Sequence, residues 1–192
     1  MKSKFTFGLK QSAAMLLLIF NQNMAFSFNC TNIKSAFVRY QSKEINIHEA
    51  VINNNIAAVK KYILAKKNIN EKDPLGGSSP LITACLYEKK AIAQLLIQAG
   101  ADINFQNNDG STALHVAAFF CKPEMVKLLL SHKANKTIKN KYGSTPLETV
   151  SAPFSTVKNI YEPMKQMFEP MGVKIDLSYI EKTRPLIAKM LK

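Results

Sequence analysis

Histidine, cysteine and carboxylate side chains are the groups of this sequence that could perform acid–base, nucleophilic or metal chemistry. The three histidines, His48, His115 and His132, are far apart in the chain, and no HExxH or CxxC spacing occurs. The 13 acidic residues are scattered, so no pair is placed for general acid–base catalysis. Gly76-Gly77 is not followed by the Gly-Lys-Ser/Thr of a phosphate-binding loop. The pattern predicts a protein that is not an enzyme and needs no cofactor.

Three cysteines, Cys30, Cys85 and Cys121, are an odd number and cannot form a complete disulfide framework. Cys85 lies among apolar residues, and we expect it to be a small buried core residue. A single disulfide between Cys30 and Cys121 is left open as an alternative. A metal site made by Cys121 and His132 is a second open alternative.

The first 27 residues have the pattern of a secretory signal peptide. Three lysines accompany an apolar block at residues 13–20, which is too short to span a bilayer, and a cleavage site is expected near Ala25 or Ser27. An amphipathic N-terminal helix or a membrane anchor is the alternative. We therefore expect an exported protein, periplasmic or secreted, with an N-terminal extension at residues 28–43 and no membrane span.

The chain is strongly basic, with 26 Lys and Arg against 13 Asp and Glu and a formal net charge of +13. Loss of residues 1–27 removes three lysines and leaves a net charge of +10. Such an excess favours an acidic partner or adhesion to an anionic surface. Nucleic acid is not an expected partner, because an exported protein rarely meets it.

A repeat of 33 residues organises the middle of the chain. One motif occurs at residues 79–84 (SPLITA), 112–117 (TALHVA) and 145–150 (TPLETV), and residues 47–50 (IHEA) fit the same register at an offset of 34. A second motif occurs at residues 66–70, 100–104 and 133–137. Apolar residues at helical spacing lie between the two motifs, so each period predicts helices.

These motifs closely resemble the ankyrin repeat, whose signature is a T-P-L-H-x-A box in a unit of about 33 residues. The resemblance covers residues 44–152 and implies an all-α solenoid of about four helix–turn–helix units with short hairpin loops. The expected units are residues 44–76, 77–109 and 110–142, with a partial unit at 143–152. Residues 153–192 lack the pattern and are expected to form a divergent helical C-terminal cap.

The third unit contains the residues that such a repeat needs locally. Thr112 is expected to cap its first helix, and Gly110 is expected to take the positive φ of the hairpin turn, as is Gly143 one period later. His115 corresponds to the histidine of the box, which in the family ties adjacent loops together by hydrogen bonds. The resemblance therefore implies a structural histidine.

The C-terminal cap is expected to contain two helices. The first covers residues 155–168, and Pro163 is expected to kink or divide it. The second starts at Asp176 or Ser178, and Pro185 marks a further kink. An apolar cluster in this segment is more typical of core than of a binding patch; its members are Met164, Met167, Phe168 and Met171.

The resemblance also implies a binding surface, because in the family the hairpin tips and the inner helices line a concave face. On this sequence its variable positions are Ser78, Leu86, Tyr87, Asn108, Asp109, Ser111, Phe119, Phe120, Lys141, Tyr142 and Ser144. Aromatic residues flanked by polar tips are typical of protein-binding hot spots. The alternative is that Phe119 or Phe120 packs against the next unit. Four lysines also form a basic edge on the last hairpin and its approach; they are Lys133, Lys136, Lys139 and Lys141. The alternative is that these lysines only form a solvated face.

The sequence therefore predicts a monomeric, exported ankyrin-repeat protein that binds a partner protein through its concave face. The identity of the partner is not encoded in these motifs. One alternative is an immunity or inhibitor protein that neutralises a toxin or enzyme in the same compartment. Another is a secreted effector, or an envelope scaffold that binds an anionic surface.

Overall fold

The computed structural model describes residues 46–192, which contain helices and no strand. The repeats contain α3 (Ile47–Ile52), α4 (Ile56–Leu64), α5 (Pro80–Leu86), α6 (Lys90–Gln98), α7 (Ala113–Phe119) and α8 (Pro123–Ser131). The C-terminal part contains α9 (Glu148–Ser151), α10 (Phe154–Phe168), the 3-10 helix η1 (Glu169–Met171) and α11 (Leu177–Leu191). The predicted all-α class is confirmed.

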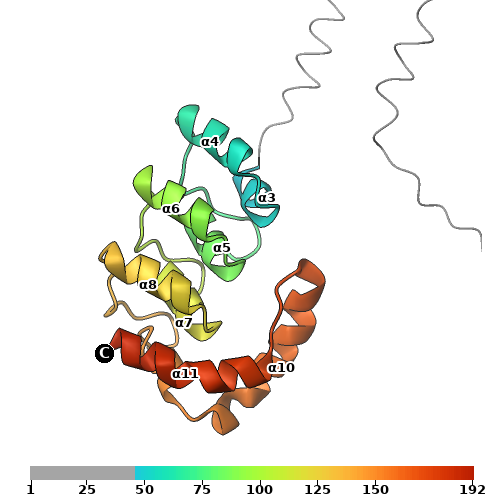
Figure 1. Ribbon diagram of the computed structural model, residues 1–192, viewed down its shortest axis with the longest axis vertical. Coiled ribbons are helices and arrows are strands. Elements are labelled where there is room, and N and C mark those ends of the chain that lie inside the picture. Colours follow the sequence, from blue (N-terminus) through green and yellow to red (C-terminus); the bar gives the residue numbers. More distant parts are fainter. Residues whose placement is uncertain (1–45) are drawn as a thin grey trace, which may run out of the picture. The chain divides into compact units, whose positions relative to one another are not determined.

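The helices form two rows (Figure 1). α3, α5, α7 and α9 pack one against the next as an inner row, and α4, α6 and α8 form an outer row. Within each of the first three units, the inner helix packs on the outer helix that follows it. α11 closes one end of the stack against α7, α8 and α9. This arrangement confirms the helix–turn–helix solenoid expected from the repeat.

The inner helices of the middle units begin at capped N-termini. The Ser79 hydroxyl accepts the N–H of Ile82 at 3.4 Å, and the Thr112 hydroxyl accepts the N–H of His115 at the same distance. Pro80 lies in the first turn of α5, where its missing N–H costs no helical hydrogen bond. The predicted cap at Thr112 is confirmed, and the His115 ring completes a capping box.

The loops repeat their backbone conformation as well. Asn54, Glu88 and Cys121 turn from an inner to an outer helix with φ of 53°, 55° and 52°. Gly110 and Gly143 have φ of 71° and 74° in the hairpins, as predicted. The backbone conformation therefore recurs after 34 and then 33 residues, even where the side chains differ.

The core runs between the two rows of helices. Its largest fully buried side chains in the repeats are Ile47, Leu81, Ile92, Leu96, Leu114, Met125 and Leu129. Apolar burial between rows and between neighbouring units is therefore the main stabilising interaction of the stack. Because each unit covers an apolar face of its neighbour, the units depend on one another.

Both C-terminal helices continue through a proline, so of the two predicted effects of Pro163, a kink or a division, the division does not occur. A proline inside a helix removes one intrahelical hydrogen bond. Tyr161 before Pro163 is fully buried and Phe168 after it packs on the core, so both halves of α10 are anchored. α11 is likewise buried on both sides of Pro185.

The last helix begins at one of its two predicted starts. The Asp176 carboxylate accepts an N–H of the first turn at 3.1 Å, whereas Ser178 lies inside α11. In the predicted apolar cluster, Met164 and Phe168 pack against the core and the other two methionines are exposed. Two of the four residues therefore belong to the core, as expected for the whole cluster, and two do not.

Residues 1–45 lie outside the described residues, and with them the predicted signal peptide, the extension at 28–43 and Cys30. Export therefore stays a prediction. Among the helices of residues 46–192, none is both long and apolar enough to span a bilayer.

Candidate functional site

Three hairpin loops precede α5, α7 and α9, and one side chain organises each of them. Asp73, Asn107 and Asn140 occupy the same position in the repeat. In each hairpin the side-chain oxygen accepts two backbone N–H groups across the turn, at 2.8 to 3.1 Å. Asp and Asn suit this position because their short side chains reach the backbone two residues ahead. The hairpin tips are therefore ordered by internal hydrogen bonds.

Asp73 is the charged member of these three residues. Partial burial would raise its pKa, but the N–H groups of Gly76, Leu75 and Ser78 donate to the carboxylate and hold the pKa below its ordinary value. The first hairpin thus keeps an ionised, fully bonded carboxylate at neutral pH. Sequence reasoning missed these organising residues, although their shared register was a signal that could have found them.

Backbone hydrogen bonds join each hairpin to the next. The Asn108 N–H donates to the Gly76 carbonyl at 3.0 Å, and the Lys141 N–H donates to the Asp109 carbonyl at 2.9 Å. The backbones approach so closely that a Cβ on Gly110 would lie 3.1 Å from the Lys141 nitrogen. The three hairpins form one hydrogen-bonded surface, which we call the hairpin row (residues 73–78, 107–111 and 140–144).

Leu75, Asp109 and Tyr142 occupy the equivalent tip position of the three hairpins. Leu75 is 82% exposed and Tyr142 is 77% exposed, and Asp109 between them in register is exposed as well. The turns are made by the backbone and the Asp or Asn side chains, so they do not require an apolar tip. Asp109 and Tyr142 were predicted as site residues. Leu75 was missed because the first hairpin is offset by one extra residue.

The other predicted hairpin residues belong to the same row. Ser78, Ser111 and Ser144 are half-buried, whereas Asn108 and Lys141 are exposed. The structure therefore places seven of the predicted site residues on one continuous surface.

Two histidines connect the hairpins to the inner helices. His115 Nδ1 accepts the N–H of Thr112 at 3.2 Å, and Nε2 lies 3.0 Å from the carbonyl of Ser144 in the next hairpin. His48 Nε2 makes a similar link to the carbonyl of Glu71, two residues before the first hairpin, at 3.0 Å. Burial lowers the pKa of His115 and outweighs the opposing effect of the carbonyls, so the ring is neutral. The expected structural role of His115 is confirmed.

The remaining predicted residues, Leu86, Tyr87, Phe119 and Phe120, lie at the opposite ends of α5 and α7. Each of these helices has seven residues, so about 10 Å of helix separates this group from the start of each helix. Leu86 and Tyr87 are half-buried, and burial raises the pKa of Tyr87. The predicted concave face thus consists of two groups of residues.

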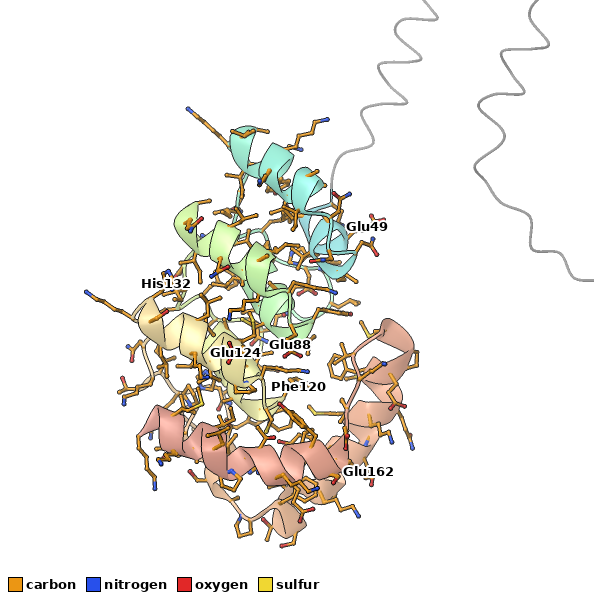
Figure 2. The ribbon with its side chains drawn as sticks, viewed as in Figure 1. Glu49, Glu88, Phe120, Glu124, His132 and Glu162 are labelled. Atoms are coloured by element: carbon orange, nitrogen blue, oxygen red, sulfur yellow. The ribbon has the colours of Figure 1, made fainter. Side chains whose placement is uncertain are left out.

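α10 covers the aromatic end of α7, where Phe120 is labelled in Figure 2. The Phe119 ring stacks on Tyr161 with centroids 4.6 Å apart, and Phe120 meets the edge of Phe168 at 5.6 Å. Phe120 is 8% exposed. The prediction that Phe120 is open to a partner is therefore wrong, because a non-repeat helix of the same chain occupies this surface. Both rings pack on α10 instead of on a further repeat.

A buried arginine fixes α10 to the end of the stack. Arg184 of α11 is 3% exposed, and its guanidinium donates to the Tyr161 hydroxyl at 2.8 Å. It also donates to the carbonyls of Thr149 and Ala152 at the end of α9, at 3.3 and 3.0 Å, where a cation is favourable. The Tyr161 hydroxyl donates in turn to the Phe119 carbonyl at 2.8 Å, and burial raises its pKa to about 12. No sequence motif signalled this network.

The two described cysteines are closed off from solvent. Cys85 and Cys121 are both 0% exposed, which confirms the expected core role of Cys85. Burial raises the pKa of Cys121 to about 11, and its thiol donates to the Ile180 carbonyl at 3.7 Å. The alternative disulfide between Cys121 and Cys30 involves a residue outside the described ones and stays a prediction. Within residues 46–192 no three potential metal ligands come together.

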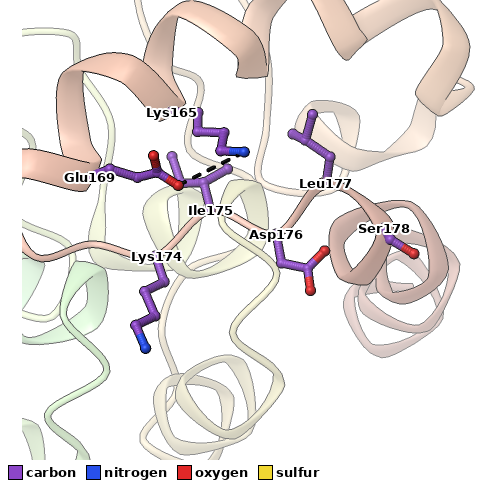
Figure 3. A pocket seen from close by; sticks show the side chains of 7 residues that line it. All are labelled: Lys165, Glu169, Lys174, Ile175, Asp176, Leu177 and Ser178. Carbon is purple, nitrogen blue, oxygen red and sulfur yellow. Dashed lines mark ion pairs between the residues drawn. The ribbon is translucent and has the colours of Figure 1, made fainter.

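An open depression of about 690 Å³ lies beside the end of α10 and the start of α11 (Figure 3). Its lining residues are Lys165, Glu169, Lys174, Ile175, Asp176, Leu177 and Ser178. Lys165 and Glu169 form an ion pair at 3.9 Å, and the Asp176 carboxylate already caps α11. The two carboxylates of the lining are therefore already engaged, one in an ion pair and the other in a helix cap.

Known proteins share the repeat. The family described as ankyrin repeats, in three copies, matches residues 47–150. Inversin from Canis lupus familiaris is 32% identical over 85 residues, which cover 44% of this chain and 8% of inversin. The inactive serine/threonine-protein kinase TEX14 from Bos taurus is 34% identical over 82 residues, covering 43% of this chain and 5% of that protein. The chain thus matches less than a tenth of the length of either relative.

A solved structure shows the same similarity. The crystal structure of the ankyrin repeat domain of Bcl-3, described as a unique member of the IkappaB protein family, is 33% identical to this chain with a TM-score of 0.52. The match covers 54% of this chain and 45% of the Bcl-3 chain. It supports the solenoid architecture described above.

Proposed function

Because the chain belongs to the ankyrin-repeat family, we propose that it binds a partner protein through the hairpin row, with Leu75, Asp109 and Tyr142 as the central contacts. Ankyrin repeats are protein–protein interaction modules, and this family and fold are typically non-catalytic. The proposal adds to that general role the surface that makes the contact.

The exposure of Leu75 and Tyr142 carries the proposal. Both side chains are more than three-quarters exposed on loops whose conformation does not need them. Large apolar side chains on an ordered surface are typical contacts in protein interfaces. The loops are already ordered by internal hydrogen bonds, so binding there loses little conformational entropy.

The helix ends at Phe119 and Phe120 are a weaker candidate. A partner that used them would have to displace Tyr161 and Phe168 of α10 from ring contacts at 4.6 and 5.6 Å. Leu86 and Tyr87 are only half-buried and could extend an interface that begins at the hairpin row.

The chemistry of the tips describes the partner surface. Leu75 and Tyr142 would fit two apolar recesses on the partner. Asp109, between them in register, would pair with a basic or N–H-donating group of the partner. Lys141 beside Tyr142 favours an acidic group at one edge of the interface. The partner is therefore a protein surface of mixed charge.

A pull-down with matched variants tests this proposal. The full chain is used as bait in an extract of its native compartment, as wild type, as Leu75→Ala/Tyr142→Ala, and as Leu186→Ala/Tyr179→Ala. The last two residues are exposed on α11 and give a control of the same composition. We expect the first variant to lose at least about tenfold of partner recovery and the control to retain it.

Equal recovery by the two double variants would contradict the hairpin row as the binding surface. A Phe119→Ala variant that loses the partner without any change in the unfolding temperature would assign binding to the helix ends instead.

We also propose export through residues 1–27, on the sequence pattern alone. Cell fractionation of the full chain and of a chain lacking these residues tests this, since only the full chain should leave the cytoplasm. The recovered partner then separates the narrower roles. A toxin or enzyme that is inhibited in the complex indicates an immunity protein, a host protein indicates an effector, and an envelope component indicates a scaffold.

A further inference from the structure

The last helix, α11, has an exposed face that the hairpin row does not use. The side of α11 that packs on the molecule is buried; its residues are Ile180, Thr183, Arg184, Ile187 and Leu191. On the other side, Tyr179 is 46% exposed and Leu186 is 51% exposed. Lys182 and Lys189 each follow one of these side chains by three residues, so each lies beside it on the helix surface, and both are exposed. We call Tyr179, Lys182, Leu186 and Lys189 the α11 face.

The two lysines of the α11 face are not neutralised by carboxylates of the described chain. Within residues 46–192, the lysines that form ion pairs with a glutamate are Lys90, Lys122, Lys127 and Lys165. Lys182 and Lys189 are not among them. α11 contains one carboxylate, that of Glu181, and consecutive residues point about 100° apart around a helix. The positive charge of the α11 face is therefore available to an anionic partner.

The basic edge of the last hairpin continues this charge. Lys136 donates to the Lys192 carbonyl at 2.9 Å, so the basic edge adjoins the end of α11. Its residues are exposed, as expected; they are Lys133, Lys136, Lys139 and Lys141. Hydrogen bonds from Thr145 chiefly, and the charge of Lys139 in addition, lower the pKa of Glu148. That carboxylate is thus bonded mainly to the backbone and side chain of Thr145, and most of the positive charge beside α11 remains.

The fold does not require the two apolar side chains of the α11 face. α11 packs against α7, α8 and α9 through its buried side, to which Tyr179 and Leu186 do not belong. They lie about two helical turns apart, and each has a lysine one turn further along. Apolar side chains bordered by lysines along one helix are the pattern of helices that lie in a membrane interface. Tyrosine suits such an interface because its ring is apolar and its hydroxyl is polar.

We propose that the α11 face docks the protein onto an anionic lipid surface. The ammonium groups of Lys182 and Lys189 are attracted to lipid phosphates, so charge complementarity sets the sign of the surface. Tyr179 and Leu186 enter the boundary between headgroups and acyl chains. They select lipid over a soluble polyanion, because a soluble polyanion offers no apolar phase. The α11 face shares no residue with the hairpin row, so this docking is independent of the proposed binding of a partner protein.

Vesicle co-sedimentation of the full chain tests the proposal, with vesicles of phosphatidylcholine alone or mixed with phosphatidylserine. Lys182→Gln/Lys189→Gln removes two charges from the α11 face. Lys60→Gln/Lys61→Gln is the matched control, since these exposed lysines belong to α4 at the other end of the stack (Figure 1). Each lysine near an anionic membrane strengthens binding about fivefold, so the first variant should bind about 25-fold more weakly and the control within about twofold of wild type. All variants share residues 1–45, so any contribution of that segment cancels.

Tyr179→Ala/Leu186→Ala tests the choice of lipid over other partners. We expect about a tenfold loss of vesicle binding and unchanged retention on immobilised polyglutamate. Circular dichroism checks that each variant keeps its helices, as all these side chains lie on the surface. The same double variant is the control of the pull-down, where the hairpin row predicts unchanged partner recovery, so the two proposals fail separately.

Three results would overturn docking by the α11 face. They are absent binding to the phosphatidylserine vesicles, equal losses from the two lysine variants, and wild-type vesicle binding by Tyr179→Ala/Leu186→Ala. If that last variant bound vesicles normally but lost the partner in the pull-down, the α11 face would be a protein-binding surface instead.

Discussion

The repeat units and the C-terminal segment of this protein are held together in different ways. From Ser79 to Ser144, the caps, turns and apolar stripes recur every 33 residues, and each helix contacts its neighbours in sequence. From Glu148 to Leu191 nothing recurs. There the main hydrogen bonds join Arg184 to residues 23 to 35 positions away, and the Tyr161 hydroxyl bonds to a carbonyl 42 positions away.

This difference shows how the solenoid ends. A further repeat would cover the apolar side of α7 with another inner helix of the same kind. Here α9 has only four residues, and α10 and α11 provide the cover instead. The cover includes the aromatic end of α7, which an open array would present to a partner. The way the array ends therefore determines which part of its surface is free to bind.

Leu114→Ala should give the largest effect, because it removes a side chain at the centre of the repeats. Leu114 is fully buried in α7, and the cavity should lower the free energy of unfolding by about 3 kcal/mol. Urea denaturation followed by circular dichroism measures this. Leu186→Ala, at a half-exposed position of α11, is the control and should cost about 0.5 kcal/mol or less. If Leu114→Ala lowered the free energy of unfolding as little as the control does, the repeats would not form one cooperative core.

Arg184→Met should separate the two regions. Methionine fills part of the space but leaves the buried acceptors at Thr149, Ala152 and Tyr161 without their donor, which should cost about 2 kcal/mol. Hydrogen exchange should show protection lost in α9 to α11 and retained in α5 and α6. Lys182→Met, at an exposed site on the same helix, should change neither the stability nor the hydrogen-exchange protection. Equal loss of protection in α5 and α6 would mean that the C-terminal segment is part of the repeat core.

Gly110→Ala and Gly143→Ala compare a hairpin inside the row with the last one. Both glycines have positive φ, so alanine should cost about 1 kcal/mol at either position. At Gly110 the new Cβ would also press on the Lys141 backbone at 3.1 Å, whereas at Gly143 nothing lies within 4 Å. Thermal unfolding should therefore show a loss about twofold larger for Gly110→Ala. Equal shifts in Tm would show that the hairpins are not packed against each other.

The smallest effect is expected from pH, at the histidine that joins α7 to the last hairpin. Burial lowers the pKa of His115 from 6.5, so below about pH 6.5 the unfolded chain binds a proton that the folded chain does not. The stability contributed by the neutral ring is present above this pH and is lost as the pH falls toward 5. Tm measured between pH 7 and pH 5 should fall less in His115→Gln than in wild type. The same fall in both proteins would assign the pH dependence to other groups.

The roles of the repeat residues could be predicted because they are local. Thr112 caps a helix three residues ahead of it, and Gly110 turns a hairpin of its own unit. Leu75 was missed in the same region for a local reason, since one additional residue in the first hairpin hid its register with Asp109 and Tyr142. That error could have been avoided from the sequence alone.

The fate of Phe119 and Phe120 could not be predicted in this way. Their position in the repeat places them at the end of an inner helix, and such an end is exposed in an array that no other segment covers. Their cover comes from Tyr161 and Phe168, which belong to no repeat and lie more than 40 positions away. Arg184 illustrates the same limit: a single arginine beside a proline gives no sign that it will be buried without a carboxylate.

The sequence by itself therefore determined the unit, its register, the all-α class and the absence of a recognisable catalytic motif. These follow from interactions within one period, where spacing alone decides which groups meet. The tertiary structure decided how the array ends, which aromatic residues are covered and which side chains project from the joined hairpins. Those outcomes depend on contacts between distant segments, because burial is a property of both partners and only one of them lies in the repeat.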